Sequence, residues 1–188
     1  MRLFVALPLP ELVRDGLRML GNGLPGARWV PPENLHLTLR FIGEVDGRDA
    51  RDIDDALAAI RMPAFALKLA GVGVFGEGRK LRSVWVGIEP NPEVTRLRDK
   101  IEQAVIRAGQ TPEARKFKPH VSIARFKNGG PPPDKLQKYL AEHALYKSEP
   151  FPIDSFTLFS SFLSSSGAIY TPEVEYELAQ PVGESSTG

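Results

Sequence analysis

Two of the three histidines in this chain lie in the same four-residue context. His36 begins His-Leu-Thr-Leu, and His120 begins His-Val-Ser-Ile. Because residues i and i+2 of a β-strand point to the same face, each motif presents an imidazole beside the hydroxyl of Thr38 or Ser122. Two such pairs could carry out a displacement at phosphorus. A neutral imidazole takes the proton of the attacking oxygen, and a protonated one gives a proton to the leaving oxygen. The hydroxyls could donate hydrogen bonds to nonbridging phosphate oxygens.

Three nearby side chains are further candidates for contacting such a substrate. Arg40 lies two positions after Thr38, so we expect it on the same face of the strand. Arg125 lies five positions after His120 and would point the opposite way in a regular strand. It reaches the site only if a β-bulge or the strand end interrupts the alternation. Phe126 falls on the face of His120, where it could contact a ribose or a base.

Other residues around the motifs are assigned to the core, to solvent or to electrostatic attraction. We expect Phe41, Phe75 and Trp85 to pack in the core, and Lys116 and Lys118 to attract a polyanion. No set of acidic residues around His36 has the spacing of a metal site, and the chain has no cysteine. We therefore expect neither a metal nor a cofactor.

The similarity between the two motifs extends to an internal repeat. Pro-x-Pro-Glu occurs at 8–11 and at 90–93, an offset of 82, whereas the histidines are 84 apart. Asp49 matches Asp134 at 85, and Phe65 matches Phe151 at 86. Two copies at nearly constant spacing suggest two similar lobes related by an approximate twofold axis, with the histidine strands facing each other across a central groove.

The hydrophobic periodicity predicts strands and helices along a single domain, which the repeat divides into two similar lobes. Residues 1–181 are expected to form this single domain, with repeats at about 1–82 and 83–178, and 182–188 a disordered tail. Strands are predicted at 2–7, 28–30, 35–42, 65–75, 81–88, 118–126, 153–162 and 168–178, and helices at 11–20, 49–60, 93–108 and 134–145.

Composition sets outer limits on the function. The chain has 188 residues, 42% of them hydrophobic and 25% charged, as is ordinary for a soluble globular protein. Its net charge of +1 means that any nucleic acid must be held by a local basic patch. Pro8 and Pro10 interrupt the first apolar stretch, so we expect no signal peptide or membrane span. The absence of cysteine suits a reducing cytoplasm, and we expect a monomer there.

The paired motifs resemble those of the two-histidine (2H) phosphoesterases, which carry an HxTx motif twice. The first is His36-Leu-Thr-Leu followed by 41–45, Phe-Ile-Gly-Glu-Val; the second is Pro119-His120-Val-Ser-Ile followed by Ala124-Arg125. The chain is most similar to the bacterial and archaeal RNA 2′,3′-cyclic phosphodiesterases, also called 2′-5′ RNA ligases. Segments 73–76 and 84–87 share this resemblance, which spans about residues 1–178. Ser122 stands where threonine is commoner in the family; it keeps the hydroxyl.

The resemblance implies a bilobal α+β fold, with two antiparallel sheets in a duplicated, pseudo-twofold arrangement, flanking helices and both histidines in a central cleft. It also implies hydrolysis of RNA 2′,3′-cyclic phosphate ends, tRNA fragments among them, to 2′-phosphates. His36 would be the proton donor and His120 the proton acceptor. The reverse reaction would join RNA ends through a 2′-5′ bond.

Two alternatives fit the same residues. The chain could bind RNA ends without turning them over, or it could be a phosphodiesterase for 2′-5′ oligonucleotides or small cyclic nucleotides. Only catalysis needs two imidazoles in opposite protonation states, so a turnover assay separates binding from hydrolysis. The sequence does not identify the physiological RNA or a base preference.

Overall fold

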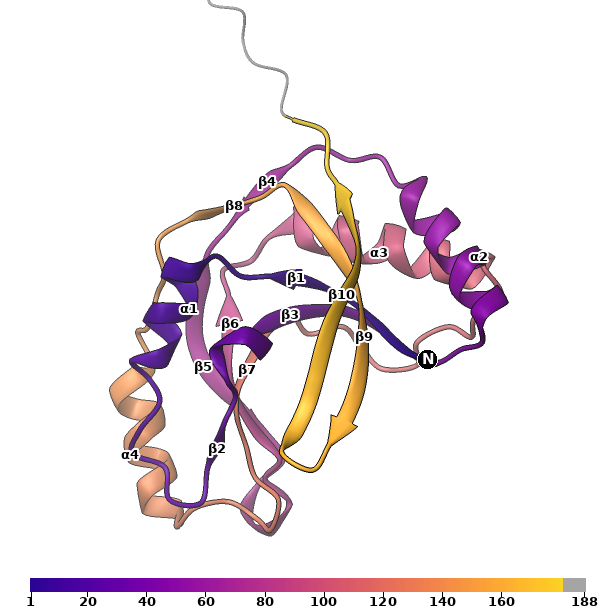
Figure 1. Ribbon diagram of the computed structural model, residues 1–188. Coiled ribbons are helices and arrows are strands. Elements are labelled where there is room, and N and C mark those ends of the chain that lie inside the picture. Colours follow the sequence, from indigo (N-terminus) through magenta and orange to yellow (C-terminus); the bar gives the residue numbers. More distant parts are fainter. Residues whose placement is uncertain (181–188) are drawn as a thin grey trace, which may run out of the picture.

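A computed structural model describes residues 1–180 of the chain, and the expected disordered tail at 182–188 lies outside the described residues. An eight-stranded antiparallel sheet forms its centre, with strand order β10-β9-β1-β3-β7-β6-β5 and a short β2 paired to β7 (Figure 1). A separate two-stranded sheet joins β4 to β8, and four α-helices flank the strands. The α+β class is confirmed.

The strands of the large sheet, in chain order, are β1 (Arg2–Pro8), β2 (Arg28–Trp29), β3 (His36–Glu44), β5 (Leu69–Phe75), β6 (Ser83–Ile88), β7 (Val121–Arg125), β9 (Ser155–Ser164) and β10 (Gly167–Glu177). The small sheet contains β4 (Phe65–Leu67) and β8 (Phe151–Ile153). The helices are α1 (Glu11–Arg18), α2 (Gly47–Ala58), α3 (Pro92–Arg107) and α4 (Pro133–His143). Single 3-10 turns lie at Pro32–Asn34 (η1) and Gly78–Lys80 (η2).

Two strand pairings lie on an approximate twofold axis. In the first, Leu37 of β3 pairs with Val121 of β7, and these residues are equivalent at the repeat offset of 84. In the second, β4 pairs antiparallel with β8, and its central pair is Ala66 with Pro152, which are equivalent at the offset of 86. Because each repeat strand pairs with its own counterpart, the two halves are related by a rotation about these pairs.

The two sheets expected from the sequence are joined, and each half of the joined sheet takes strands from both repeats. Strands β9 and β10 of the second repeat extend β1 of the first, while β5 of the first repeat pairs with β6 of the second. A spatial half therefore does not coincide with a sequence repeat. The repeat pattern could not show this exchange because it carries no information on which strand pairs with which.

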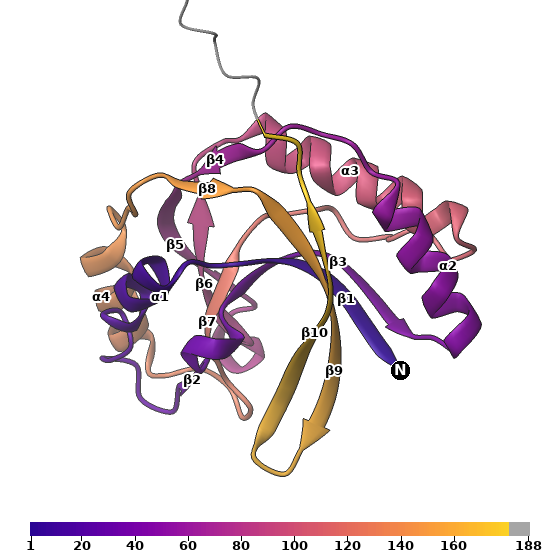
Figure 2. The ribbon, with the colours of Figure 1, turned by 45° about the horizontal axis from the view of Figure 1, so that its top comes forward.

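The helices also pack across the repeats. Figures 1 and 2 show α1 beside α4 at one side of the sheet and α2 beside α3 at the other. Next to the first pair, the Tyr139 hydroxyl of α4 donates to the Leu20 carbonyl, just after α1, at 2.8 Å. Helix α2 begins at an Asp46 cap, whose carboxylate accepts from the backbone N–H groups of Arg48 and Asp49. No helix in residues 1–180 is both long and apolar enough to cross a membrane.

Candidate active site

The pairing of Leu37 with Val121 positions both histidine motifs on one face of the sheet. Continuing that antiparallel register by one residue each way places His36 opposite Ser122, and Thr38 opposite His120. Leu37 and Val121 themselves are fully buried on the other face. Diagonal neighbours on one face of such a pair lie about 7–8 Å apart, so the two imidazoles can reach one small group between them.

Each histidine strand contains a β-bulge at the equivalent position. In the pairing of β3 with β1, Thr38 and Arg40 are partners of two successive residues of β1, so Leu39 is left unpaired. In the pairing of β7 with β6, Ser122 and Ala124 are partners of two successive residues of β6, so Ile123 is left unpaired. The extra residue reverses the alternation, so the side chain three positions after each hydroxyl residue returns to the site face.

The bulge in β7 brings Arg125 to the site and removes Phe126 from it. Arg125 is exposed, has no hydrogen-bonded or ion-paired partner within residues 1–180, and lies close enough to both histidines to lower their pKa values. This is the bulge that the sequence analysis required for Arg125. Phe126 is only 8% exposed and belongs to the core, so its expected contact with a ribose or base is wrong.

The bulge in β3 likewise places Arg40 and Phe41 on the faces opposite to those expected. Arg40 faces the core at 6% exposure, where its guanidinium donates to Glu102 of α3 and to the carbonyls of Phe41 and Thr111. It is therefore a structural residue and not a phosphate ligand. Phe41, expected in the core, is 38% exposed on the site face, at the position equivalent to Arg125.

Both imidazoles are oriented by the same kind of hydrogen bond to a backbone carbonyl. The ring Nδ1 of His36 lies 2.7 Å from the carbonyl oxygen of Asn34, and that of His120 lies 2.6 Å from the carbonyl oxygen of Lys118. In each case the carbonyl belongs to the residue two positions earlier. Since a carbonyl can only accept, Nδ1 carries the proton, and in the neutral ring Nε2 is left as the basic atom.

The two hydroxyls differ in their contacts. Thr38 Oγ1 lies 2.9 Å from His36 Nε2, so the hydroxyl donates to the neutral ring and accepts from the protonated one. No corresponding bond joins Ser122 to His120 in the described part of the chain. The Nε2 of His120 is therefore left without such a partner to accept a proton from another molecule.

In the ligand-free protein, burial disfavours the protonated form of both histidines. It is the main cause that lowers the pKa of His36 from 6.5 to about 4; the Asn34 carbonyl opposes this change, and the charges of Arg125 and His120 add to it. The pKa of His120 is also lowered, first by burial and then by Arg125 and Lys118, against the Lys118 carbonyl. A phosphate anion between the rings favours their charged forms and would raise both pKa values.

Aromatic side chains surround His36. Its ring lies 5.0 Å from that of Phe4 and 5.3 Å from that of Tyr170, which it meets edge to face. Tyr170 comes from the β9–β10 hairpin, which is tied to η1 because the Asn34 side chain donates to the Ala168 carbonyl at 3.0 Å. Neither Phe4 nor Tyr170 was predicted at the site, because the partner of β1 in the sheet could not be inferred from sequence.

The surroundings of His120 combine aromatic rings with a cation. The ring of Phe75, at the end of β5, lies 4.8 Å from that of His120, and the ring of Trp85 in β6 lies 6.1 Å from it. The Lys118 ammonium lies 4.6 Å from the Trp85 ring centre. Phe75 and Trp85 were expected in the core, and the structure places both against this histidine.

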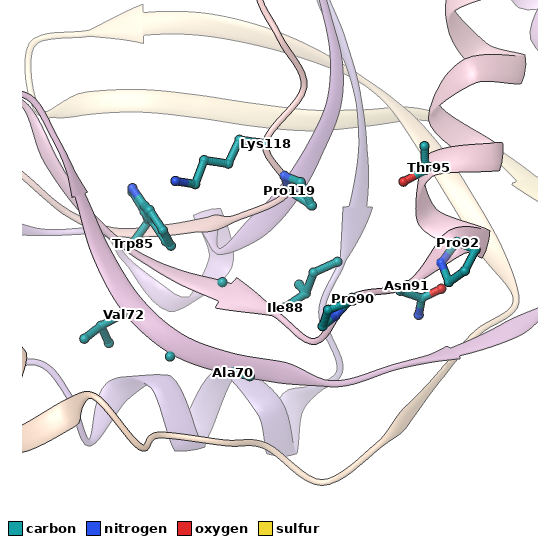
Figure 3. A pocket seen from close by; sticks show the side chains of 12 residues that line it. Ala70, Val72, Trp85, Ile88, Pro90, Asn91, Pro92, Thr95, Lys118 and Pro119 are labelled. Atoms are coloured by element: carbon teal, nitrogen blue, oxygen red, sulfur yellow. The ribbon is translucent and has the colours of Figure 1, made fainter.

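A hollow of about 600 Å³ lies along β5 and β6 (Figure 3). Trp85 lines it together with Lys118 and Pro119, the two residues before His120, and the Asn91 cap of α3 lies at the other end. The Trp85 indole packs closely against Gly73, where a Cβ would lie 2.4 Å from it. Within residues 1–180, no three His, Asp or Glu side chains gather in a way that could hold a metal ion.

Comparison with known proteins gives consistent matches over nearly the whole chain. The family described as LigT like Phosphoesterase matches twice, at residues 7–85 and 86–170. An RNA 2′,3′-cyclic phosphodiesterase of Aeropyrum pernix is 37% identical over 84% of this chain and 89% of its own. The crystal structure of TT0787 from Thermus thermophilus covers 96% of this chain and 99% of its own at 28% identity and a TM-score of 0.78. Escherichia coli LigT complexed with 3′-AMP covers 95% and 98%, at 26% identity and a TM-score of 0.75.

The two arginines that follow the motifs should respond to substitution in opposite ways. Arg40→Ala leaves the buried Glu102 carboxylate without its partner and should lower the free energy of unfolding by about 3–5 kcal/mol. Arg125→Gln, on the surface, should change it by less than about 0.5 kcal/mol. It should weaken the binding of inorganic phosphate about tenfold or more, because a hydrogen bond to a charged group is lost. Urea unfolding and calorimetry measure the two effects. Equal destabilisation by both variants would contradict the assignment.

The titration of His36 should depend on phosphate. In the free protein its imidazole should titrate near pH 4, and saturating inorganic phosphate should move that titration towards neutral pH. Nitrogen-15 NMR of the imidazole follows the change. A His36 titration that is the same with and without phosphate would mean that the anion binds elsewhere.

Proposed function

This chain belongs to the LigT-like phosphoesterase family, and we propose that it hydrolyses RNA 2′,3′-cyclic phosphate ends to 2′-phosphates by acid–base catalysis with His36 and His120. The observation that carries the proposal is the presentation of two imidazoles on one strand pair, each with its Nδ1–H bonded to a backbone carbonyl. The A. pernix relative, named for this activity, supports the choice of substrate.

His120 is the proposed proton acceptor. Its Nδ1–H donates to the Lys118 carbonyl, which orients the ring and leaves Nε2 free to take the proton of an attacking water. In the ligand-free protein the lowered pKa of His120 leaves this nitrogen unprotonated at neutral pH, and in the complex the positive charge of a protonated His36 nearby opposes a second protonation at His120. As the O–H bond of the water breaks, its oxygen forms the new bond to phosphorus.

His36 is the proposed proton donor. When the substrate phosphate raises its pKa, the protonated Nε2 gives its proton to the ribose 3′-oxygen as the P–O3′ bond breaks. Thr38, Ser122 and Arg125 lie on the same face and would stabilise the negative charge on the nonbridging oxygens. The step ends with His36 neutral and His120 protonated, and proton exchange with solvent restores the starting state. We propose that the chain acts without metal or cofactor, as a cytoplasmic monomer.

Removing either imidazole should abolish most activity. His36→Ala and His120→Ala should each lower kcat by about a hundredfold to ten-thousandfold on an RNA ending in a 2′,3′-cyclic phosphate. The double variant should be little worse than either single one, because the pair acts as a unit. His143→Ala is the matched control and should keep wild-type kcat. Retention of more than a tenth of kcat by either single variant would exclude the two-histidine mechanism. Absence of turnover in the wild type would favour an RNA-end binding protein.

The product should carry a 2′-phosphate and a free 3′-hydroxyl. With one imidazole on each side of phosphorus, in-line attack fixes which ribose oxygen meets the donor, and the proposed orientation gives His36 the 3′-oxygen. Phosphorus NMR of the product distinguishes the two isomers, and a phosphatase specific for 3′-phosphates should leave the product intact. A 3′-phosphate as the main product would show that His36 does not protonate the 3′-oxygen, while leaving acid–base catalysis by the two histidines in place.

A further inference from the structure

Two arginines stand side by side at the end of β7. Arg28 of β2 is the direct ladder partner of Arg125, so both side chains lie on the face that carries the histidines. Directly opposite like charges destabilise a strand pair. Neither arginine forms an ion pair with any acidic residue in the described chain. A bound anion would relieve this repulsion.

A hollow of about 520 Å³ lies next to Arg28 of this pair. Arg28 and Lys127 line it, together with the small residues of two loops at 25–26 and 128–130. Lys127 follows Arg125 by two residues, so its backbone lies about 7 Å farther along the chain direction. The hollow therefore offers cations and open space one step beyond Arg125.

The tip of the β5–β6 hairpin adds further cations beside the hollow. The backbone N–H of Phe126 donates to the Arg82 carbonyl at 2.9 Å, and the N–H of Gly130 donates to the Gly78 carbonyl at 3.3 Å. These bonds hold the hairpin tip against the loop that follows β7. The basic strip formed in this way consists of Arg28, Arg79, Lys80, Arg125 and Lys127, all of them exposed. Glu77 is the one carboxylate within segments 23–30, 77–82 and 125–130, although the whole chain has a net charge of only +1.

The strip is continuous with the proposed reaction centre. Arg125 lies within electrostatic range of both histidines, so the strip begins where the terminal phosphate would bind. In the other half of the twofold, the position of Arg125 is taken by Phe41, whose ring lies 5.3 Å from the Arg2 guanidinium, and Ala124 is replaced by the buried Arg40. The two halves therefore present different groups to a bound polyanion.

We propose that the basic strip binds the phosphodiester chain that leads to the cyclic end, so that the preferred substrate is an RNA oligonucleotide and not a cyclic mononucleotide. The inference rests on the proposed function and adds the surface that holds the RNA beyond its cyclic end. A mononucleotide ends at Arg125, whereas an oligonucleotide places its next phosphates over Arg28 and Lys127. Each cation that meets a phosphate releases a counterion and makes binding dependent on salt.

The test compares two substrates and two double variants. Kinetics are measured on a short RNA ending in a 2′,3′-cyclic phosphate and on a 2′,3′-cyclic mononucleotide with the same base. Arg28→Gln with Lys127→Gln removes two charges from the strip. Arg48→Gln with Arg51→Gln removes two exposed charges from α2, on the other side of the molecule from β2 (Figures 1 and 2), and is the matched control. Thermal unfolding checks that both variants remain folded.

The strip variant should lower kcat/KM for the RNA relative to the mononucleotide about tenfold or more. The plot of log kcat/KM against log salt for the RNA should lose about 1.4 from its slope, since a single strand contributes about 0.7 per phosphate contact. The control variant should leave both quantities as in the wild type. A ratio within twofold of the wild type, with an unchanged salt slope, would overturn the inference and leave the strip for another partner, such as an acidic protein. If the wild type hydrolysed neither substrate, the proposed function itself would fail.

Discussion

The pairing of β3 with β7 at Leu37 and Val121 is the constraint on which the rest of the site depends. It is the one ladder pair between these strands in the described chain, and it lies on the approximate twofold axis. Both side chains are fully buried, which fixes the register from the core side of the sheet. A slip of one residue would turn both imidazoles towards the core. Leu37 lies between His36 and Thr38, and Val121 lies between His120 and Ser122. The burial of these two apolar side chains therefore sets the position of both histidines.

Strands from the two repeats are intertwined in one sheet. Each half of the sheet is completed by strands from the other repeat, and each helix pair joins helices from both repeats. A single repeat would leave β1 without β9 and the apolar faces of its helices without partners. The buried Arg40–Glu102 pair adds a polar tie between β3 and α3 across the repeats. The histidines are thus held by a continuous sheet and not by two lobes that could move apart.

The sequence was sufficient for the element types and the paired motifs, but not for the side of the sheet on which each later residue lies. The bulges at Leu39 in β3 and at Ile123 in β7 account for three wrong placements, those of Arg40, Phe41 and Phe126. The second bulge had a visible signal, because Ile123 and Ala124 are consecutive apolar residues that break the alternation. The first had none, since the buried Arg40 reads as a surface residue. The carbonyls that hold Nδ1 are backbone groups, which no side-chain pattern reveals.

The twofold relation supplies two similar imidazoles, whereas acid–base catalysis requires them to differ. The differences lie in what surrounds each ring. His36 is enclosed by Phe4 and Tyr170, while His120 lies against Phe75 and Trp85 and near the cation of Lys118. Burial lowers the pKa of His36 to about 4, so a donor at this position must gain its proton together with a negatively charged ligand. Binding of the phosphate and protonation of His36 are therefore coupled, and the site acquires its general acid only when the group to be cleaved is present.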